Sequence, residues 1–119
     1  MYKWNNRYPA NCPKAEAIEQ KFTEVYRFVI SNPPDEKDFL PHAVLRNDKK
    51  PECNLFGISF FVDKKTAEIK QNQNLAQQNK YIAKGWIAIS DGTTKLNDEG
   101  HINLWMYENV QLHQRFIVE

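Results

Sequence analysis

The feature that most limits how this chain can fold is a series of short segments rich in β-branched and aromatic residues. They are bounded by stretches that contain proline, glycine, asparagine or aspartate, and they cover residues 23–30, 55–62, 81–89, 101–107 and 112–118. Apolar runs of this length between turn residues are typical of β-strands. The sequence therefore predicts a twisted sheet of four or five strands, with mixed or antiparallel pairing.

The pattern within the segments also predicts part of the strand order. Segment 81–89 is apolar at both alternating sets of positions, which is typical of a central strand. Segments 101–107 and 112–118 are separated by a short polar stretch at Glu108 and Asn109. We therefore expect these last two strands to be linked as a hairpin.

Three stretches carry helix signals. Apolar residues lie at helical spacing behind Pro13, which suits the first turn of a short helix over residues 13–21. Asp63 is a favourable N-cap for a second helix at residues 64–74, whose few apolar residues place it on the surface. The apolar segment 39–45 contains a proline, so we expect a loop with a partial helical turn there.

Length and charge narrow the possibilities further. With residues 1–13 as an irregular lead-in, 119 residues suit a single α+β domain, residues 1–119, with two short helices. The net charge of +1 argues against a protein that coats nucleic acid, because such proteins need surplus positive charge. Four glycines are too few for a glycine-rich phosphate loop. No apolar run is long enough to cross a bilayer, so we expect no membrane partner.

The two cysteines, Cys12 and Cys53, do not form a disulfide framework or a zinc-type pair. The first residues contain no apolar stretch like that of a signal peptide, which predicts a cytoplasmic protein. Reduced thiols are favoured in that compartment, although a bridge between Cys12 and Cys53 stays open. The histidines and cysteines show no ligand spacing, so no metal site is expected.

Candidate functional residues are polar side chains placed within apolar strands. Arg27, Ser59, His101 and Asn103 have this position, Glu108 follows a strand end, and His42 lies in an apolar loop. Burial of such groups without partners is costly. Each residue therefore either lies on a solvent-facing side of the sheet or takes part in a site.

The order of three of these residues, together with Tyr26, resembles the ADP-ribosyltransferase-like pattern. Tyr26 and Arg27 lie on an early strand, Ser59 lies on a strand that leads into a helix, and Glu108 comes late. The resemblance implies that Arg27, with Tyr26, binds the diphosphate of NAD, since guanidinium forms forked hydrogen bonds. It also implies that Ser59 braces the nicotinamide pocket or the glutamate, and that Glu108 stabilises the charge that develops as nicotinamide leaves. NAD is expected only under this interpretation, and no cofactor otherwise.

A second enzymatic interpretation rests on histidine. His42 and His101 could form an acid–base pair with Glu108, because imidazole titrates near neutral pH. Two histidines with an arginine clamp suit a hydrolase or nuclease that uses no metal. Only the fold can show whether these side chains meet.

Basic residues near aromatic ones raise the question of nucleic-acid binding. The candidates are Lys64, Lys65, Lys70, Lys80 and Lys84, with Tyr81 and Trp86 between or beside them. Glu68 dilutes their charge, and Trp86 is better explained as a core residue, so a nucleic-acid partner is not expected. Residues 70–80 contain seven Asn or Gln in eleven positions, which is typical of a solvated helix end or loop without a functional role.

The function favoured by the sequence is a small binding or regulatory module that acts on a protein partner. Trp4, Tyr8, Trp105 and Tyr107 could form an aromatic patch, and such residues dominate binding hot spots. The same aromatics would lie in the core if their strand were central. The alternative function is the ADP-ribosyltransferase-like enzyme that uses Arg27, Ser59 and Glu108.

Overall fold

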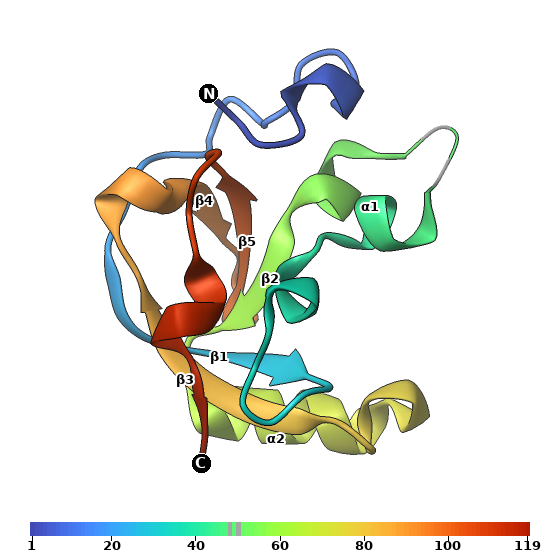
Figure 1. The fold of residues 1–119 in the computed structure, drawn as a ribbon, viewed down its shortest axis with the longest axis vertical. Helices are drawn as coiled ribbons and strands as arrows, with labels where there is room; N and C mark the ends of the chain where they lie inside the picture. The colour runs from blue at the N-terminus through green and yellow to red at the C-terminus, as the bar shows by residue number, and fades with distance from the viewer. Residues whose placement is uncertain (48, 50) are drawn as a thin grey trace.

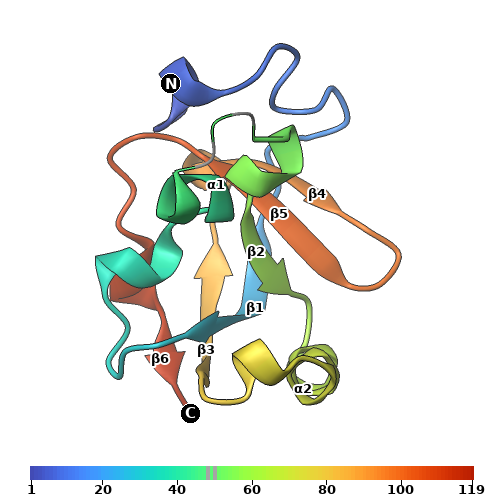
Figure 2. The same cartoon turned by 90° about the vertical axis from the view of Figure 1, so that its right-hand side faces the viewer.

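The computed structural model describes residues 1–47, 49 and 51–119, which fold around one six-stranded antiparallel sheet (Figures 1 and 2). The strands are β1 (Phe22–Val29), β2 (Ile58–Phe61), β3 (Tyr81–Ile87), β4 (Gly92–Leu96), β5 (His101–Met106) and β6 (Ile117–Val118). Their order across the sheet is β4-β5-β2-β1-β3-β6. The predicted single α+β domain with an antiparallel sheet is confirmed, and the strand count is six rather than four or five.

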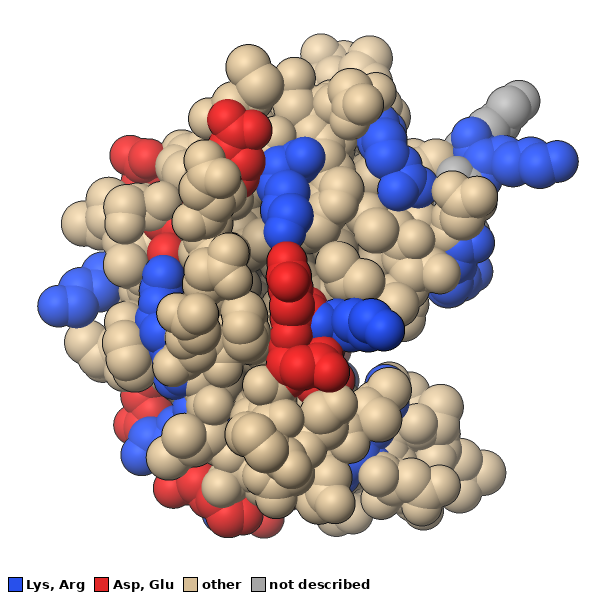
Figure 3. Space-filling view, viewed as in Figure 1, with Lys and Arg blue, Asp and Glu red and all other residues tan. Residues whose placement is uncertain are grey.

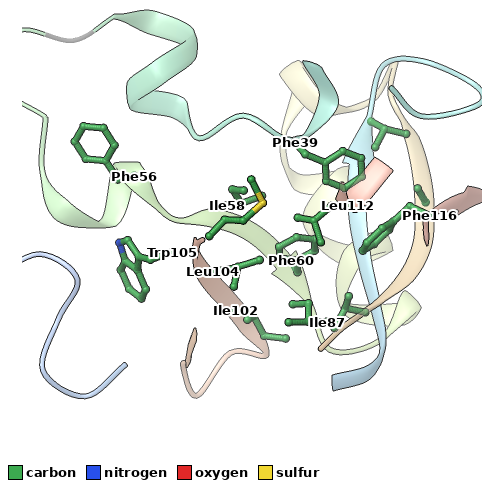
Figure 4. Packing of buried hydrophobic residues seen from close by; sticks show 14 of the residues in the cluster. Phe39, Phe56, Ile58, Phe60, Ile87, Ile102, Leu104, Trp105, Leu112 and Phe116 are labelled. Atoms are coloured by element: carbon green, nitrogen blue, oxygen red, sulfur yellow. The ribbon is translucent and has the colours of Figure 1, made fainter. Parts of the chain in front are cut away.

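The two faces of the sheet bury different groups. Alternate residues of β1, β2, β3 and β5 build the main core with Phe39, Leu112 and Phe116 from the connecting segments (Figure 4). The opposite face carries a smaller cluster, in which Tyr26 and Phe61 pack against Ala67 of α2 (Lys64–Gln73). The sheet is therefore buried on both faces, with α2 covering part of the second one.

Both helices follow from local sequence signals. The Asp63 side chain accepts a hydrogen bond from the Thr66 N–H at 2.7 Å, so α2 begins as the capping pattern predicts. The partial helical turn expected within residues 39–45 is α1 (His42–Arg46), which ends at Asn47 with a φ of 51°. Asparagine tolerates this left-handed conformation better than most residues do.

The prediction of a helix at residues 13–21 is wrong. This stretch is extended or turned, and Ile18 forms an isolated bridge with Thr94 on β4. The Ile18 N–H donates to the Thr94 carbonyl at 3.0 Å, and the Thr94 N–H donates back at 2.7 Å. These long-range backbone bonds replace the local helical bonds, and Ile18 is left exposed instead of buried on a helix face.

The end of the chain also differs from the prediction. Strand β4 forms from a segment outside the predicted strands, and residues 112–115, predicted as part of the last strand, form a 3-10 helix. The expected hairpin between the last two strands is absent from the sheet of the described residues, because β5 pairs with β2 and β4 whereas β6 pairs with β3. Strand β3 lies next to the edge of the sheet, and the edge strand β6 has only two residues. Trp86 of β3, which was predicted to be a core residue, is 46% exposed.

The cysteines are bonded to each other. Cys12 and Cys53 form a disulfide with their Cα atoms 5.4 Å apart, so the expectation of reduced thiols is wrong and the open alternative is the one observed. The bond joins the lead-in to the 3-10 helix Cys53–Phe56. Disulfides persist mainly in oxidising compartments, so this bond weighs against the cytoplasmic location, which stays a prediction. Among the described residues, no helix has the length and apolar character needed to span a bilayer.

Candidate functional site

A pocket of about 480 Å³ opens on the α2 face of the sheet. In Figure 2 this side faces the viewer, with α1 above and α2 below β2, and Figure 3 shows the molecule deeply notched there, with basic side chains on the walls of the notch. The lining residues are Arg27, Phe28, His42, Ser59, Phe61, Lys70, Gln73, Asn74, Gln77, Lys80, Asn97, Glu99 and His101. The volume lies within the range of small-molecule sites.

The floor of the pocket comes from three neighbouring strands. Antiparallel pairing places Phe61 of β2 opposite His101 of β5 and opposite Tyr26 of β1. Residues two apart on a strand share a face, so Ser59 and Phe28 lie on the same side as Phe61. The register therefore brings a hydroxyl, an imidazole and two aromatic rings together from segments far apart in the sequence.

The second wall comes from the amide-rich stretch 70–80. Lys70 and Gln73 belong to α2, and the chain then turns back toward β3. The Gln71 side-chain amide donates to the carbonyls of Gln77 and Lys80, at 3.0 and 2.9 Å. This clamp fixes the turn that carries Lys80 to the pocket.

Arg27 is anchored from two sides. Its Nε donates to the Asp38 carbonyl at 2.8 Å, and its Nη1 donates to the Ser59 carbonyl at 2.7 Å. The guanidinium carbon lies 5.6 Å from the centre of the Phe39 ring and 5.7 Å from that of Phe60. Burial lowers the pKa of Arg27 to about 10, so the side chain stays charged at neutral pH. The cation is thus held in place by bonds to carbonyls, and none of the described carboxylates is bonded to it directly.

His101 is placed by the turn between β4 and β5. The Asn97 side chain accepts from the N–H groups of Glu99 and His101, at 2.9 and 3.0 Å. The imidazole packs edge-on against Phe61, with ring centres 5.8 Å apart. Burial lowers the pKa of His101, and the positive charges of Lys70 and Arg27 lower it further. The ring is therefore neutral at pH 7 and able to accept a proton.

Positive charge dominates the pocket. Burial lowers the pKa of Lys80, and the nearby charge of Arg27 adds to this effect. Lys70 lies 3.7 Å from Glu99, which is the only carboxylate among the described lining residues. Asp38 lies behind Arg27, with its carboxylate engaged by the Ile30 and Asp35 N–H groups. The positive charges of Arg27 and Lys80 are therefore held near each other, and nearby carboxylates neutralise them only in part.

The structure brings some predicted site residues together and separates others. Arg27, Ser59 and His101 line the pocket, and so does His42. Glu108 lies outside it, exposed beyond the far end of β5, a strand that spans about 17 Å from its first residue to its last.

Tyr26 does not line the pocket either. It is buried under α2, and its hydroxyl donates to Glu24. The geometry therefore does not assemble the expected Arg–Ser–Glu arrangement around one hollow.

The other candidate surfaces are changed as well. Trp105 is fully buried and Trp4 nearly so, which removes the expected aromatic patch from the surface. Lys84 pairs with Glu24 at 3.1 Å, whereas Lys64 and Lys65 lie on the exposed part of α2.

Residues 70–80, which were predicted to have no functional role, contribute several side chains to the pocket. The available signal was two lysines that bracket an amide-rich run, a composition able to bind anions and polar ligands. Among the described residues, no three His, Cys, Asp or Glu side chains are grouped as metal ligands. In comparisons with known proteins, no family profile, curated protein or solved structure matches the chain.

Proposed function

We propose that this protein binds a phosphate-bearing small molecule, of the nucleotide class, in the pocket between the sheet and α2. The observation that carries the proposal is the gathering of Arg27, Lys70 and Lys80 around one hollow in which Glu99 is the sole lining carboxylate of the described residues. Cations whose charge is only partly neutralised attract anions more strongly in a partly enclosed site than in open solvent, because the local dielectric is lower than that of water. Burial lowers the pKa values of His101 and Lys80, and neighbouring positive charge lowers both further.

Aromatic and amide groups favour a nucleotide over a simple anion. Phe28 and Phe61 lie in the pocket floor with ring centres 5.2 Å apart, and the half-buried Phe28 ring can stack on a base. The Gln77 Oε1 atom is buried and has no hydrogen-bond partner among the described residues. A ligand with an amino or hydroxyl group would satisfy it, and unsatisfied buried acceptors are costly otherwise.

The ADP-ribosyltransferase-like alternative becomes a narrower proposal. NAD is itself a phosphate-bearing nucleotide, and Arg27 and Ser59 both line the pocket proposed to bind the phosphate. Glu108 is too far away to act on it, so any chemistry at the bound ribose would have to use Glu99. Incubation with NAD, followed by measurement of free nicotinamide, separates the two ideas, because only the alternative requires nicotinamide release. Binding of NAD and of AMP is compatible with both.

The direct test is a proton NMR titration of the His101 imidazole in increasing inorganic phosphate. A bound anion favours the imidazolium form, so phosphate should raise the pKa of His101, and AMP should do so at lower concentration. His113 lies outside the pocket and serves as the internal control. If phosphate and AMP leave His101 and His113 equally unaffected, the proposal fails.

A matched pair of variants gives a second test. Lys80→Met removes a lining charge, and Lys65→Met removes an exposed charge outside the pocket. At a separation of about 6 Å, one charge contributes about 1–3 kcal/mol between the dielectric of water and that of a protein surface. Lys80→Met should therefore weaken AMP binding roughly 5- to 100-fold, whereas Lys65→Met should change it less than about 2-fold. Equal effects of the two variants would contradict a localised site.

Protein binding, expected from the sequence, stays a prediction with a different surface. Trp86 and Ile117 are exposed beside Arg115, on a groove of about 320 Å³ at the β3–β6 edge. Exposed aromatic and aliphatic groups of this kind occur at protein interfaces. A pull-down compared between the wild type and Trp86→Ser tests whether this edge retains a partner.

A further inference from the structure

We infer that the pocket cleaves a ribonucleotide phosphodiester, with His101 as general base and His42 as general acid. The inference rests on the proposed function, because it requires that the pocket binds a phosphate. It adds the substrate class, single-stranded RNA or a dinucleotide, and a reaction. The observation behind it is that two imidazoles from separate elements line the same hollow as Arg27 and Lys80.

The dimensions suit this chemistry. A hollow of 480 Å³ is about 10 Å across, so a phosphate at its centre can lie within reach of groups on opposite walls. His101 projects from the floor at the start of β5, whereas His42 begins α1 on another wall. A general acid and a general base must approach the reacting oxygens from different sides, and two separate elements provide that arrangement.

The protonation of His101 suits a base. Its pKa is lowered by burial and by Lys70 and Arg27, so the neutral form is present at pH 7. The edge-on contact with Phe61 restricts rotation of the ring. A neutral imidazole with a restrained orientation can accept a proton from a ribose hydroxyl with little reorganisation.

The reaction is a transesterification that consumes no water. His101 removes the proton of the ribose 2′-hydroxyl, and the 2′-oxygen attacks the adjacent phosphorus to form a new P–O bond. The bond from phosphorus to the 5′-oxygen breaks, and His42 gives that oxygen a proton. The products are a 2′,3′-cyclic phosphate and a free 5′-hydroxyl, with one proton moved from the substrate to His101 and one from His42 to the leaving group.

The cations have a role in the same step. Negative charge on the non-bridging oxygens grows as the phosphorus becomes five-coordinate. Arg27 is fixed by its bonds to two carbonyls, and Lys80 approaches from the other wall. Preorganised positive groups of this kind stabilise the transition state more than the ground state.

The test is cleavage of a short unstructured RNA by the full chain in the presence of EDTA, with mass-spectrometric analysis of the ends. The expected products carry a 2′,3′-cyclic phosphate and a 5′-hydroxyl. An oligonucleotide of the same sequence with 2′-deoxyribose at every position lacks the 2′-hydroxyl nucleophile, so it should bind without being cut. This substrate control does not depend on any variant being folded.

The three histidines provide matched variants. His101→Asn and His42→Asn should each lower the cleavage rate about 100-fold or more, whereas His113→Asn, outside the pocket, should cleave as the wild type does. The pH–rate profile should lose its acidic limb in His101→Asn. Thermal unfolding of each variant establishes that it is folded.

The outcomes separate the inference from the proposal on which it rests. The inference is supported if the wild type produces cyclic phosphate ends and both His101→Asn and His42→Asn fail to produce them. Binding of AMP without RNA cleavage overturns the inference and leaves the proposed function standing. No binding of phosphate, AMP or RNA overturns both, and cleavage that survives in His101→Asn and His42→Asn overturns the assignment of the histidines.

Discussion

Reduction of the disulfide between Cys12 and Cys53 should lower the free energy of unfolding by about 4 kcal/mol. The bond closes a loop with a sequence separation of 41 residues. In the chain-entropy treatment, cross-linking a loop of that length removes about 13 cal/mol/K from the unfolded ensemble, which corresponds to about 4 kcal/mol at 25 °C. This is a large fraction of the stability of an ordinary domain, about 5–15 kcal/mol.

The assay is urea unfolding followed by tryptophan fluorescence, with and without a reductant such as TCEP. The midpoint should fall on reduction, and the slope with urea should rise because the reduced unfolded chain exposes more surface. The double variant Cys12→Ser/Cys53→Ser should match the reduced wild type and show no response to TCEP. Two free thiols in protein prepared without reductant, or a loss below about 1 kcal/mol after complete reduction, would refute this reasoning.

The position of the loop predicts a further detail of the same experiment. The closed loop contains β1 and α1, and therefore Arg27 and His42 of the pocket. β1 is held independently by its pairing with β2 and β3. Reduced protein that remains folded should therefore bind AMP within about 2-fold of the oxidised protein, because the disulfide acts mainly on the unfolded state.

Two further predictions concern charged groups. The Asp91 carboxylate is 1% exposed and accepts from the Ala88 N–H and from both terminal nitrogens of Arg115, so Asp91→Ala should destabilise the fold by about 3–5 kcal/mol, measured by urea unfolding. A double-mutant cycle with Arg115→Met should recover part of that loss, and additive effects would contradict coupling of the pair. Because the pKa of His101 is lowered in the free protein and an anion favours its protonated form, the affinity for a dinucleoside monophosphate, whose phosphodiester stays anionic throughout this range, should rise as the pH falls from 8 to 5.5. The change should disappear in His101→Asn, and an affinity independent of pH in the wild type would exclude His101 from the site.

The sequence predicted those parts of the fold that rest on local patterns. Alternating apolar residues predicted β1 and β2, and Asp63 predicted the start of α2, because strand faces and helix caps are properties of neighbouring residues. The helix at residues 13–21 failed because the observed backbone partner of Ile18 is Thr94, far away in the sequence. Likewise, the two threonines in β4 were a weak strand signal, and their pairing with β5 depends on the turn between the two strands.

The site was predictable only in part for a related reason. Arg27, Ser59 and His101 could be identified because each interrupts an apolar strand, and such interruptions are expected at functional positions. Lys70 and Lys80 carry no such mark, since lysine in a polar stretch is ordinary. Their role depends on the turn after α2, which returns the chain beside the sheet, and no local pattern specifies that return.

The substitution Lys80→Met is expected not to destabilise the free protein. Burial and the neighbouring Arg27 both lower the pKa of Lys80, which means that its charged form is held at a cost in the empty pocket. Methionine keeps much of the aliphatic stem and removes the charge, so the free energy of unfolding should stay equal or rise slightly while AMP binding falls.

Urea unfolding of Lys80→Met and Lys65→Met measures the first effect, and the same samples give the second. A residue whose role is structural would lose stability and binding together. Loss of binding with unchanged or higher stability is the expected sign of a charge retained for a ligand. A loss of more than about 1 kcal/mol in Lys80→Met alone would assign Lys80 to the support of the fold instead.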